Sequence, residues 1–185
     1  MDALELLLNR YSQGKLTEPA PSDAALNTIL CAGLRAPDHA HLRPWRFLVY
    51  RGEGREELGC IFERAAKNNP DLNDAAVLKA PTLPLRAPIV ITVIAQVVDH
   101  PKVPRVEQLL SAGCATMAMQ QAAQALGFGG IWRSGVYTQD PYVNDALELG
   151  PEDEIVGFLY LGTEQFQGKP SEVPNLSDFV TFIGE

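Results

Sequence analysis

The segment VEQLLSAGCATMAMQQAAQAL, residues 106–126, constrains the architecture most strongly, because it has the length of a long helix and almost no charge. Glu107 is its only charged residue, whereas a helix on a protein surface normally presents a polar face to water. Such a helix is about 30 Å long, and a chain of 185 residues has difficulty covering it on every side. We therefore expect a partner subunit to cover part of it, with small residues such as Gly113 allowing close approach. A central helix in a monomeric fold is the alternative.

On both sides of this segment, the sequence predicts helices and strands in alternation. The nearly continuous β-branched run at 89–98 is typical of a central strand that is buried on both faces. Further strands are expected at 45–51, 128–134 and 155–161, and further helices at 2–10, 22–34, 55–67, 74–79 and 140–147, with a loop at 13–21. This order indicates an α+β or α/β layered structure with few strands, and the length predicts a single domain over 1–185.

Composition excludes several classes of protein. With 46% hydrophobic and 21% charged residues the chain is not a disordered tail. Its net charge of −8 argues against nucleic acid as a partner. The uncharged stretch 108–132 contains four glutamines and four glycines, which favours a buried helix over a membrane span.

The acidic N-terminus does not resemble a signal peptide, and we expect the three scattered cysteines to belong to a protein of the reducing cytoplasm. One of them, Cys114, is expected to be inert packing inside the long helix.

The first candidate for chemistry is Arg10-Tyr11-Ser12, at the end of the first predicted helix. A forked cation and a hydroxyl two residues apart can converge on one phosphate group. Taken alone, an arginine near a helix C-terminus more often compensates the helix dipole.

A second candidate is RAPDHAHLRPW, residues 35–45, which holds two Arg, two His and one Asp directly before a strand. It could form a polar wall for a planar ligand, or it could be a solvated loop. A metal site using His39 and His41 is disfavoured, because structural zinc takes four ligands and the only other histidine is His100. We expect no metal.

The third candidate is GFGGIWRSG, residues 127–135, whose glycines let the backbone approach a ligand closely. Its spacing fits neither a dinucleotide-binding fingerprint nor a P-loop. A helix C-cap followed by a strand explains it equally well. No GxSxG motif for nucleophilic catalysis is present.

Together, the three segments resemble the FMN-dependent nitroreductase family, and the resemblance extends over nearly the whole chain. The family has an Arg-Arg-Ser-like element after its first helix and an Ala-Pro-Ser…Pro-Trp segment before its first strand. The segments 102–105, 111–114 and 155–163 also resemble its short NAD(P)H nitroreductase branch. The resemblance implies an α+β nitroreductase-like fold, with an antiparallel-dominated sheet surrounded by helices, in an intertwined homodimer with FMN sites at the interface.

The resemblance also implies roles for residues. Arg10 and Ser12 would hold the FMN phosphate or ribityl chain, with Tyr11 where the family has a second arginine. Arg35 and the 37–43 loop would line the flavin, and His39 would reach the site of the partner subunit. The remaining candidates are Ile131, Trp132 and Arg133 beside the isoalloxazine or phosphate, and, more weakly, Gln121, Ala122, Ala123, Gln124, Ala125 and Leu126 for the nicotinamide.

The implied function is hydride transfer from NAD(P)H through flavin N5 to an acceptor such as a nitroaromatic, quinone or enone, with no catalytic side chain required. Asp38, His41 and Arg43 replace the Ser, Asn and Gln usual in the family, which makes the pocket more cationic and suits a negatively charged acceptor. Two alternatives remain: a flavin carrier or sensor without turnover, and a structural dimer without a ligand.

Overall fold

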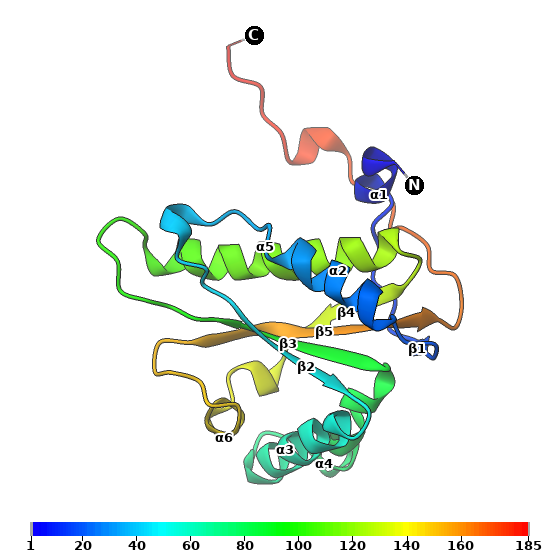
Figure 1. The fold of residues 1–185 in the computed structure, drawn as a ribbon, viewed down its shortest axis with the longest axis vertical. Coiled ribbons are helices and arrows are strands. Elements are labelled where there is room, and N and C mark those ends of the chain that lie inside the picture. Colours follow the sequence, from blue (N-terminus) through cyan, green and yellow to red (C-terminus); the bar gives the residue numbers. More distant parts are fainter. Residues whose placement is uncertain (1, 185) are drawn as a thin grey trace.

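The computed structural model describes residues 2–184 and places a five-stranded antiparallel sheet between two layers of helices (Figure 1). The strand order is β1-β5-β3-β2, and β4 pairs with β5 along part of its length. This arrangement confirms the α+β class with an antiparallel sheet. The strands are β1 (Leu16–Thr17), β2 (Arg46–Arg51), β3 (Ile89–Ala95), β4 (Gly129–Arg133) and β5 (Glu154–Glu164).

Helices cover both faces of the sheet. In Figure 1, α2 and α5 lie on one face, while α3, α4 and α6 lie on the other. Ser22 begins α2 by accepting a hydrogen bond from the backbone N–H of Ala25, as expected of an N-cap residue. The helices are α1 (Ala3–Leu8), α2 (Asp23–Gly33), α3 (Gly54–Asn68), α4 (Asp74–Lys79), α5 (Arg105–Ala125) and α6 (Pro141–Ala146).

Strand β3 is buried along all seven of its residues, as its β-branched run predicts. Ile91 and Val93 pack with α2 and α5, whereas Val90 and Ile94 pack with α3 on the other side. Because successive side chains of a strand point to opposite faces, both faces of β3 must be apolar to serve two helical layers.

Helix α5 has one covered side and one open side. Its buried residues, among them Met119, face the sheet and α2. On the other side Val106, Leu110 and Met117 are exposed, Leu110 by 64%. Cys114 is exposed as well, so the expectation that it is inert packing was wrong for a single chain. The uncharged sequence of the helix therefore leaves an apolar face that residues 2–184 do not cover.

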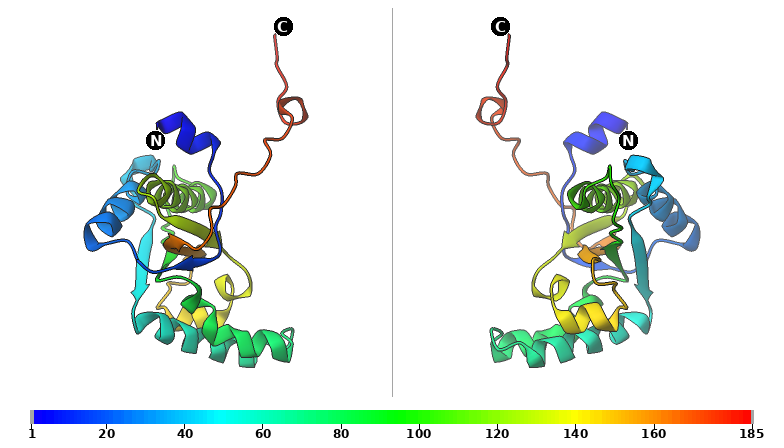
Figure 2. Two further views of the ribbon diagram at one scale, coloured as in Figure 1. Left: turned by 90° about the vertical axis from the view of Figure 1, so that its right-hand side faces the viewer. Right: turned by 90° about the vertical axis from the view of Figure 1, so that its left-hand side faces the viewer.

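The C-terminal segment 165–184 leaves the end of β5 and runs away from the body of the protein, on the same side as α1 (Figures 1 and 2). It carries exposed apolar side chains at Phe179 and Phe182, and Ile183 is 94% exposed. Within the described residues 2–184, no helix is both long and apolar enough to cross a membrane.

Candidate functional site

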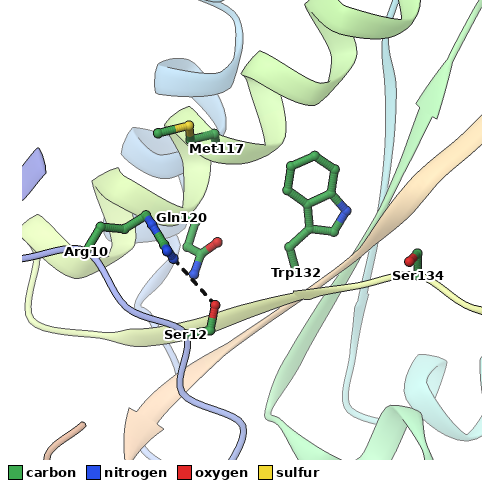
Figure 3. Close-up of a pocket in the computed structure, with 6 residues that line it drawn as sticks. All are labelled: Arg10, Ser12, Met117, Gln120, Trp132 and Ser134. Carbon is green, nitrogen blue, oxygen red and sulfur yellow. Dashed lines mark hydrogen bonds between the residues drawn. The ribbon is translucent and has the colours of Figure 1, made fainter. Parts of the chain in front are cut away.

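A cavity of about 400 Å³ lies between the segment after α1, the outer side of α5 and strand β4 (Figure 3). Arg10 and Ser12 stand at one end, where Nη1 of Arg10 donates to Oγ of Ser12 over 3.5 Å. Met117 and the indole of Trp132 supply apolar walls. The cavity is lined by Arg10, Ser12, Met117, Gln120, Trp132 and Ser134. We call it the arginine cavity.

Gln120 fixes the strip of chain that carries Ser12. It is buried in α5, and its Nε2 donates to the carbonyl oxygens of Tyr11 at 3.3 Å and Gly130 at 3.1 Å. The backbone N–H of Gln13 also donates to Gly130 O, at 2.9 Å. The segment 11–13 is thereby held along β4. One signal for this contact is present in the sequence, because a glutamine in an apolar helix needs hydrogen-bond partners when it is buried.

Trp132 is half-exposed at the cavity, and its orientation is fixed by one hydrogen bond. Its indole Nε1 donates to the carbonyl of Val156 in β5 at 3.2 Å. Sequence reasoning selected Trp132, but it missed Met117 and Gln120, which line the same cavity. Both are ordinary residues of a helix, and only packing shows which side of α5 faces the cavity.

A second cavity, of about 410 Å³, lies on the opposite side of β4. Because side chains alternate along a strand, Ile131 and Arg133 line this second cavity with their side chains while the indole of Trp132 lies on the α5 side. Trp132 and Ser134 belong to the walls of both cavities, so the two adjoin at the end of β4. The candidates at 131–133 are therefore divided between two neighbouring spaces.

Arg133 and Tyr160 lie near each other in the second cavity. The guanidinium carbon of Arg133 lies 5.9 Å from the centre of the Tyr160 ring, and Nε of Arg133 is buried without a hydrogen-bond partner in the described chain. Burial raises the pKa of Tyr160 to about 12, although the nearby Arg133 works against that shift. The hydroxyl of Tyr160 is therefore neutral and available as a donor at any physiological pH.

Tyr11 points away from the arginine cavity. Its hydroxyl donates to Oε2 of Glu164 at 2.9 Å, and the backbone N–H of Gly168 donates to the same carboxylate oxygen at 3.2 Å. Burial, followed by the contact with Glu164, raises the pKa of Tyr11. The expected contact between Tyr11 and a cofactor therefore has no side-chain basis in this arrangement, and Tyr11 instead fastens the start of the C-terminal segment.

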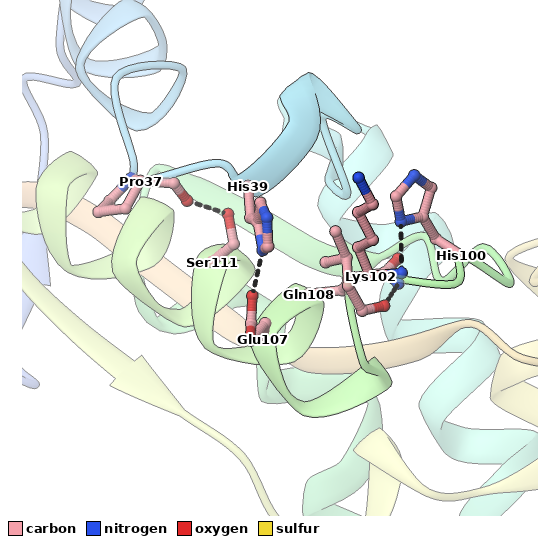
Figure 4. A network of polar contacts seen from close by, with 8 residues as sticks. Pro37, His39, His100, Lys102, Glu107, Gln108 and Ser111 are labelled. Atoms are coloured by element: carbon pink, nitrogen blue, oxygen red, sulfur yellow. Dashed lines mark hydrogen bonds and ion pairs between the residues drawn. The ribbon is translucent and has the colours of Figure 1, made fainter.

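Arg35 lines a third cavity, of about 530 Å³, which we call the loop cavity. It is formed by Leu34, Arg35, Ala36, Asp38, His41, Arg43 and Trp45. Arg10 and Arg35 therefore line different cavities of one chain. His39 lines neither of them, because its Nδ1 lies 2.8 Å from Oε2 of Glu107 at the start of α5 (Figure 4).

The segment 121–126 lies at the C-terminal end of α5 beside α1, and none of its residues lines the arginine cavity. Gln124 donates to the carbonyl of Asn9 at 3.3 Å, and Ala123 is buried. A role of the segment 121–126 in binding a nicotinamide stays a prediction.

Among residues 2–184 there is no group of three or more His, Cys, Asp or Glu side chains placed to hold a metal ion.

Comparison with known proteins identifies the family to which this chain is related. The model of the Nitroreductase family matches residues 7–163. "Putative NAD(P)H nitroreductase YdjA" of Escherichia coli K12 is 52% identical over 184 residues, which cover 99% of this chain and 100% of that protein. "Putative NAD(P)H nitroreductase" of Haemophilus influenzae is 40% identical over 185 residues, which cover 99% of this chain and 100% of that protein.

Solved structures share the fold. A nitroreductase-like family protein from Bacillus cereus superposes with a TM-score of 0.84 at 21% identity, covering 100% of this chain and 97% of the other. A nitroreductase with bound FMN from Bacteroides fragilis gives a TM-score of 0.73 at 22% identity and covers 97% of each chain. These structural similarities show the nitroreductase-like fold, and the sequence matches show that the chain is related to the nitroreductase family. The chain belongs to the nitroreductase family of oxidoreductases.

Proposed function

We propose that this protein is an FMN-dependent NAD(P)H oxidoreductase that reduces a small acceptor such as a nitroaromatic, a quinone or an enone. The observation that carries the proposal is the arginine cavity, where the guanidinium of Arg10 and the hydroxyl of Ser12 face the same space beside the indole of Trp132. The names of the relatives and the FMN bound to a structural neighbour support it.

The residues of the cavity fit FMN. A forked guanidinium next to a hydroxyl suits a phosphate group, and the apolar walls at Met117 and Trp132 suit an aromatic ring system. The volume of about 400 Å³ lies within the usual range for small-molecule sites. On the other side of β4, Arg133 lines the adjoining second cavity, so its positive charge lies close to the strand that walls the arginine cavity.

Bound FMN would supply the hydride-transfer chemistry between NAD(P)H and the acceptor. The chain itself would bind and orient. Arg10 and Ser12 would hold the phosphate, and Trp132 would exclude water from one side of the ring. Arg133 would place positive charge near the ring, which favours the reduced, anionic form of a flavin. We assign no acid–base role to a side chain.

We further propose a homodimer whose interface includes the open face of α5. Val106, Leu110 and Met117 form that face, and they are apolar and exposed in one chain. A second copy packed there would cover this face, and its C-terminal segment would supply further apolar side chains. It would also bring its own loop 35–45 toward the arginine cavity, so that Arg35 and His39 act across the interface.

A flavin carrier or sensor without turnover is the second candidate. It is favoured by the direction of Tyr11, which leaves Arg10 as the one cation lining the arginine cavity within the described chain. Retained FMN does not distinguish the two functions, whereas electron transfer from NAD(P)H does.

The test is an absorption spectrum of the purified protein before and after anaerobic addition of NADPH and, separately, NADH. We expect a stoichiometric amount of FMN and bleaching of the flavin band by at least one nucleotide, with recovery of the band when a nitroaromatic is added. Bound FMN that neither nucleotide bleaches would establish the carrier or sensor. FAD in place of FMN, or no flavin after reconstitution with excess FMN, would refute both proposals.

A further inference from the structure

Gln120 is a buried polar residue in the wall of the arginine cavity. Only 5% of the residue is exposed, and yet it lines the cavity. In Figure 3 it lies between the end marked by Arg10 and Ser12 and the indole of Trp132. An amide group in such a place needs hydrogen-bond partners from the protein or from a ligand, because an unpaired polar group is costly away from water.

The nitrogen of this amide is paired within the chain. Nε2 of Gln120 donates to the carbonyl oxygens of Tyr11 at 3.3 Å and Gly130 at 3.1 Å. A backbone carbonyl accepts hydrogen bonds and never donates them, so an amide turned the other way round would set its oxygen against two oxygens. The two contacts therefore fix the orientation of the amide, with its nitrogen toward the segment 11–13.

The oxygen of the same amide is left for the cavity. Figure 3 shows Oε1 of Gln120 pointing into the space between Arg10 and Trp132. Among residues 2–184, no group donates a hydrogen bond to it. The cavity thus holds a hydrogen-bond acceptor in a fixed orientation, between a cation and an aromatic wall.

The order of these groups along the cavity matches the order of the parts of FMN. The ribityl chain of FMN joins the phosphate to the flavin ring, and it carries hydroxyl groups. In the proposed function the phosphate lies at Arg10 and Ser12, and the ring lies beside Trp132. The chain between them then passes Gln120, and a hydroxyl is a donor of the kind that an unpaired amide oxygen requires.

We propose that Gln120 recognises the ribityl chain of FMN by accepting a hydrogen bond at Oε1 from one of its hydroxyl groups. The inference rests on the proposed function, because it requires FMN in the arginine cavity. It gives the site a selection for the hydroxylated chain, in addition to contacts with phosphate and ring. A flavin phosphate without these hydroxyls would leave Oε1 unpaired and shielded from water, and such a loss is a general source of specificity.

The experiment measures the affinity of the full chain for two flavins by fluorescence titration. One is FMN, and the other is an analogue in which a plain phosphopentyl chain replaces ribityl phosphate, so that only the hydroxyls are lost. Gln120→Met keeps the length of the side chain and removes both polar atoms of the amide. Gln13→Met is the matched control, because Gln13 fastens the same segment by donating to the carbonyl of Phe166 at 2.8 Å but does not line the cavity.

We expect wild-type protein to prefer FMN to the analogue, and Gln120→Met to reduce this preference about 2- to 12-fold, the effect of one neutral hydrogen bond. Loosening of the segment 11–13 should lower the affinity for both flavins by a common factor, which cancels in the ratio. Gln13→Met should therefore leave the ratio unchanged. Gln120→Glu keeps an oxygen acceptor and loses the amide donors, so it should retain the preference while it binds both flavins more weakly.

An unchanged ratio in Gln120→Met, or the same change in Gln13→Met, would overturn the proposal and would leave Gln120 with a structural role alone. Equal affinities of wild-type protein for the two flavins would also overturn it. If Gln120→Met does not fold, the ratio in Gln120→Glu decides, and a lost preference there counts against the proposal.

The proposed function fails by different results. Wild-type protein that binds neither flavin would refute both the function and the role of Gln120. Bound FMN that NAD(P)H does not bleach would refute turnover alone, and the comparison of the two flavins would still test Gln120.

Discussion

The indole of Trp132 lies so close to Gly157 that a Cβ at position 157 would overlap its Nε1. Trp132 belongs to β4 and Gly157 to β5, and the same indole donates to the carbonyl of the preceding residue, Val156, at 3.2 Å. The missing side chain at 157 therefore determines where one wall of the arginine cavity stands.

Gly157→Ala should displace the indole and destabilise the protein by about 1–3 kcal/mol, the usual cost of overpacking. The tryptophan fluorescence and near-ultraviolet circular dichroism should change, and FMN should bind more weakly. Gly113→Ala is the matched control, because its Cβ would meet the same indole at an ordinary 3.6 Å. Equal effects of the two substitutions would contradict this account of Trp132.

Arg10→Ala should weaken FMN binding by about 10- to 150-fold, which corresponds to about 1.5–3 kcal/mol for a charge-assisted hydrogen bond. Riboflavin lacks the phosphate, so its affinity should change much less. Equilibrium dialysis or flavin fluorescence with the two ligands measures the difference. If FMN and riboflavin lose affinity equally, Arg10 supports the fold and does not hold the phosphate.

Tyr11→Phe is the neighbouring control for Arg10→Ala. It removes the hydroxyl that donates to Glu164 and leaves the carbonyl that accepts from Gln120. We expect a loss of stability of about 0.5–1.5 kcal/mol and an unchanged affinity for FMN, measured by urea unfolding and by flavin titration. A large loss of FMN affinity would show that Tyr11 turns toward the cofactor.

Leu110→Glu should dissociate the proposed dimer, because it places like charges and desolvated carboxylates on the open face of α5. Light scattering at micromolar concentration should then give the mass of one chain. Leu78→Glu is the matched control: Leu78 is 77% exposed on α4, on the far side of the sheet, against 64% for Leu110. A wild-type monomer that still binds FMN would refute the dimer.

Tyr160 should make the protein sensitive to alkali. Its folded pKa of about 12 lies above the ordinary 10.0, so between these values the unfolded chain loses a proton that the folded chain keeps. The contribution is complete below pH 10 and is lost as the pH rises toward 12, by about 1.4 kcal/mol at pH 11. Urea unfolding at pH 8 and pH 11 should show this decline in wild type and a smaller one in Tyr160→Phe.

Much of the fold is encoded locally. The β-branched run of β3 and the long uncharged α5 are recognisable because their periodicity and composition depend only on neighbouring residues. Strand β1 was missed, since 13–21 was expected to be a loop. It contains only Leu16 and Thr17, and it exists because Glu164 and Thr163, far along the chain, offer a pairing edge. A two-residue strand has no periodicity of its own.

The pairing of Arg10 with Ser12 could be predicted from the amino-acid sequence, because residues two positions apart remain neighbours in any fold. Long-range packing, in contrast, brings Gln120 and Met117 to the same cavity and turns Tyr11 to Glu164. It also directs the side chains of Ile131 and Arg133 to the face of β4 opposite the arginine cavity. The same packing leaves one side of α5 open. The sequence could not show these features, because the direction of a side chain depends on what packs against its element, and those partners lie far away along the chain.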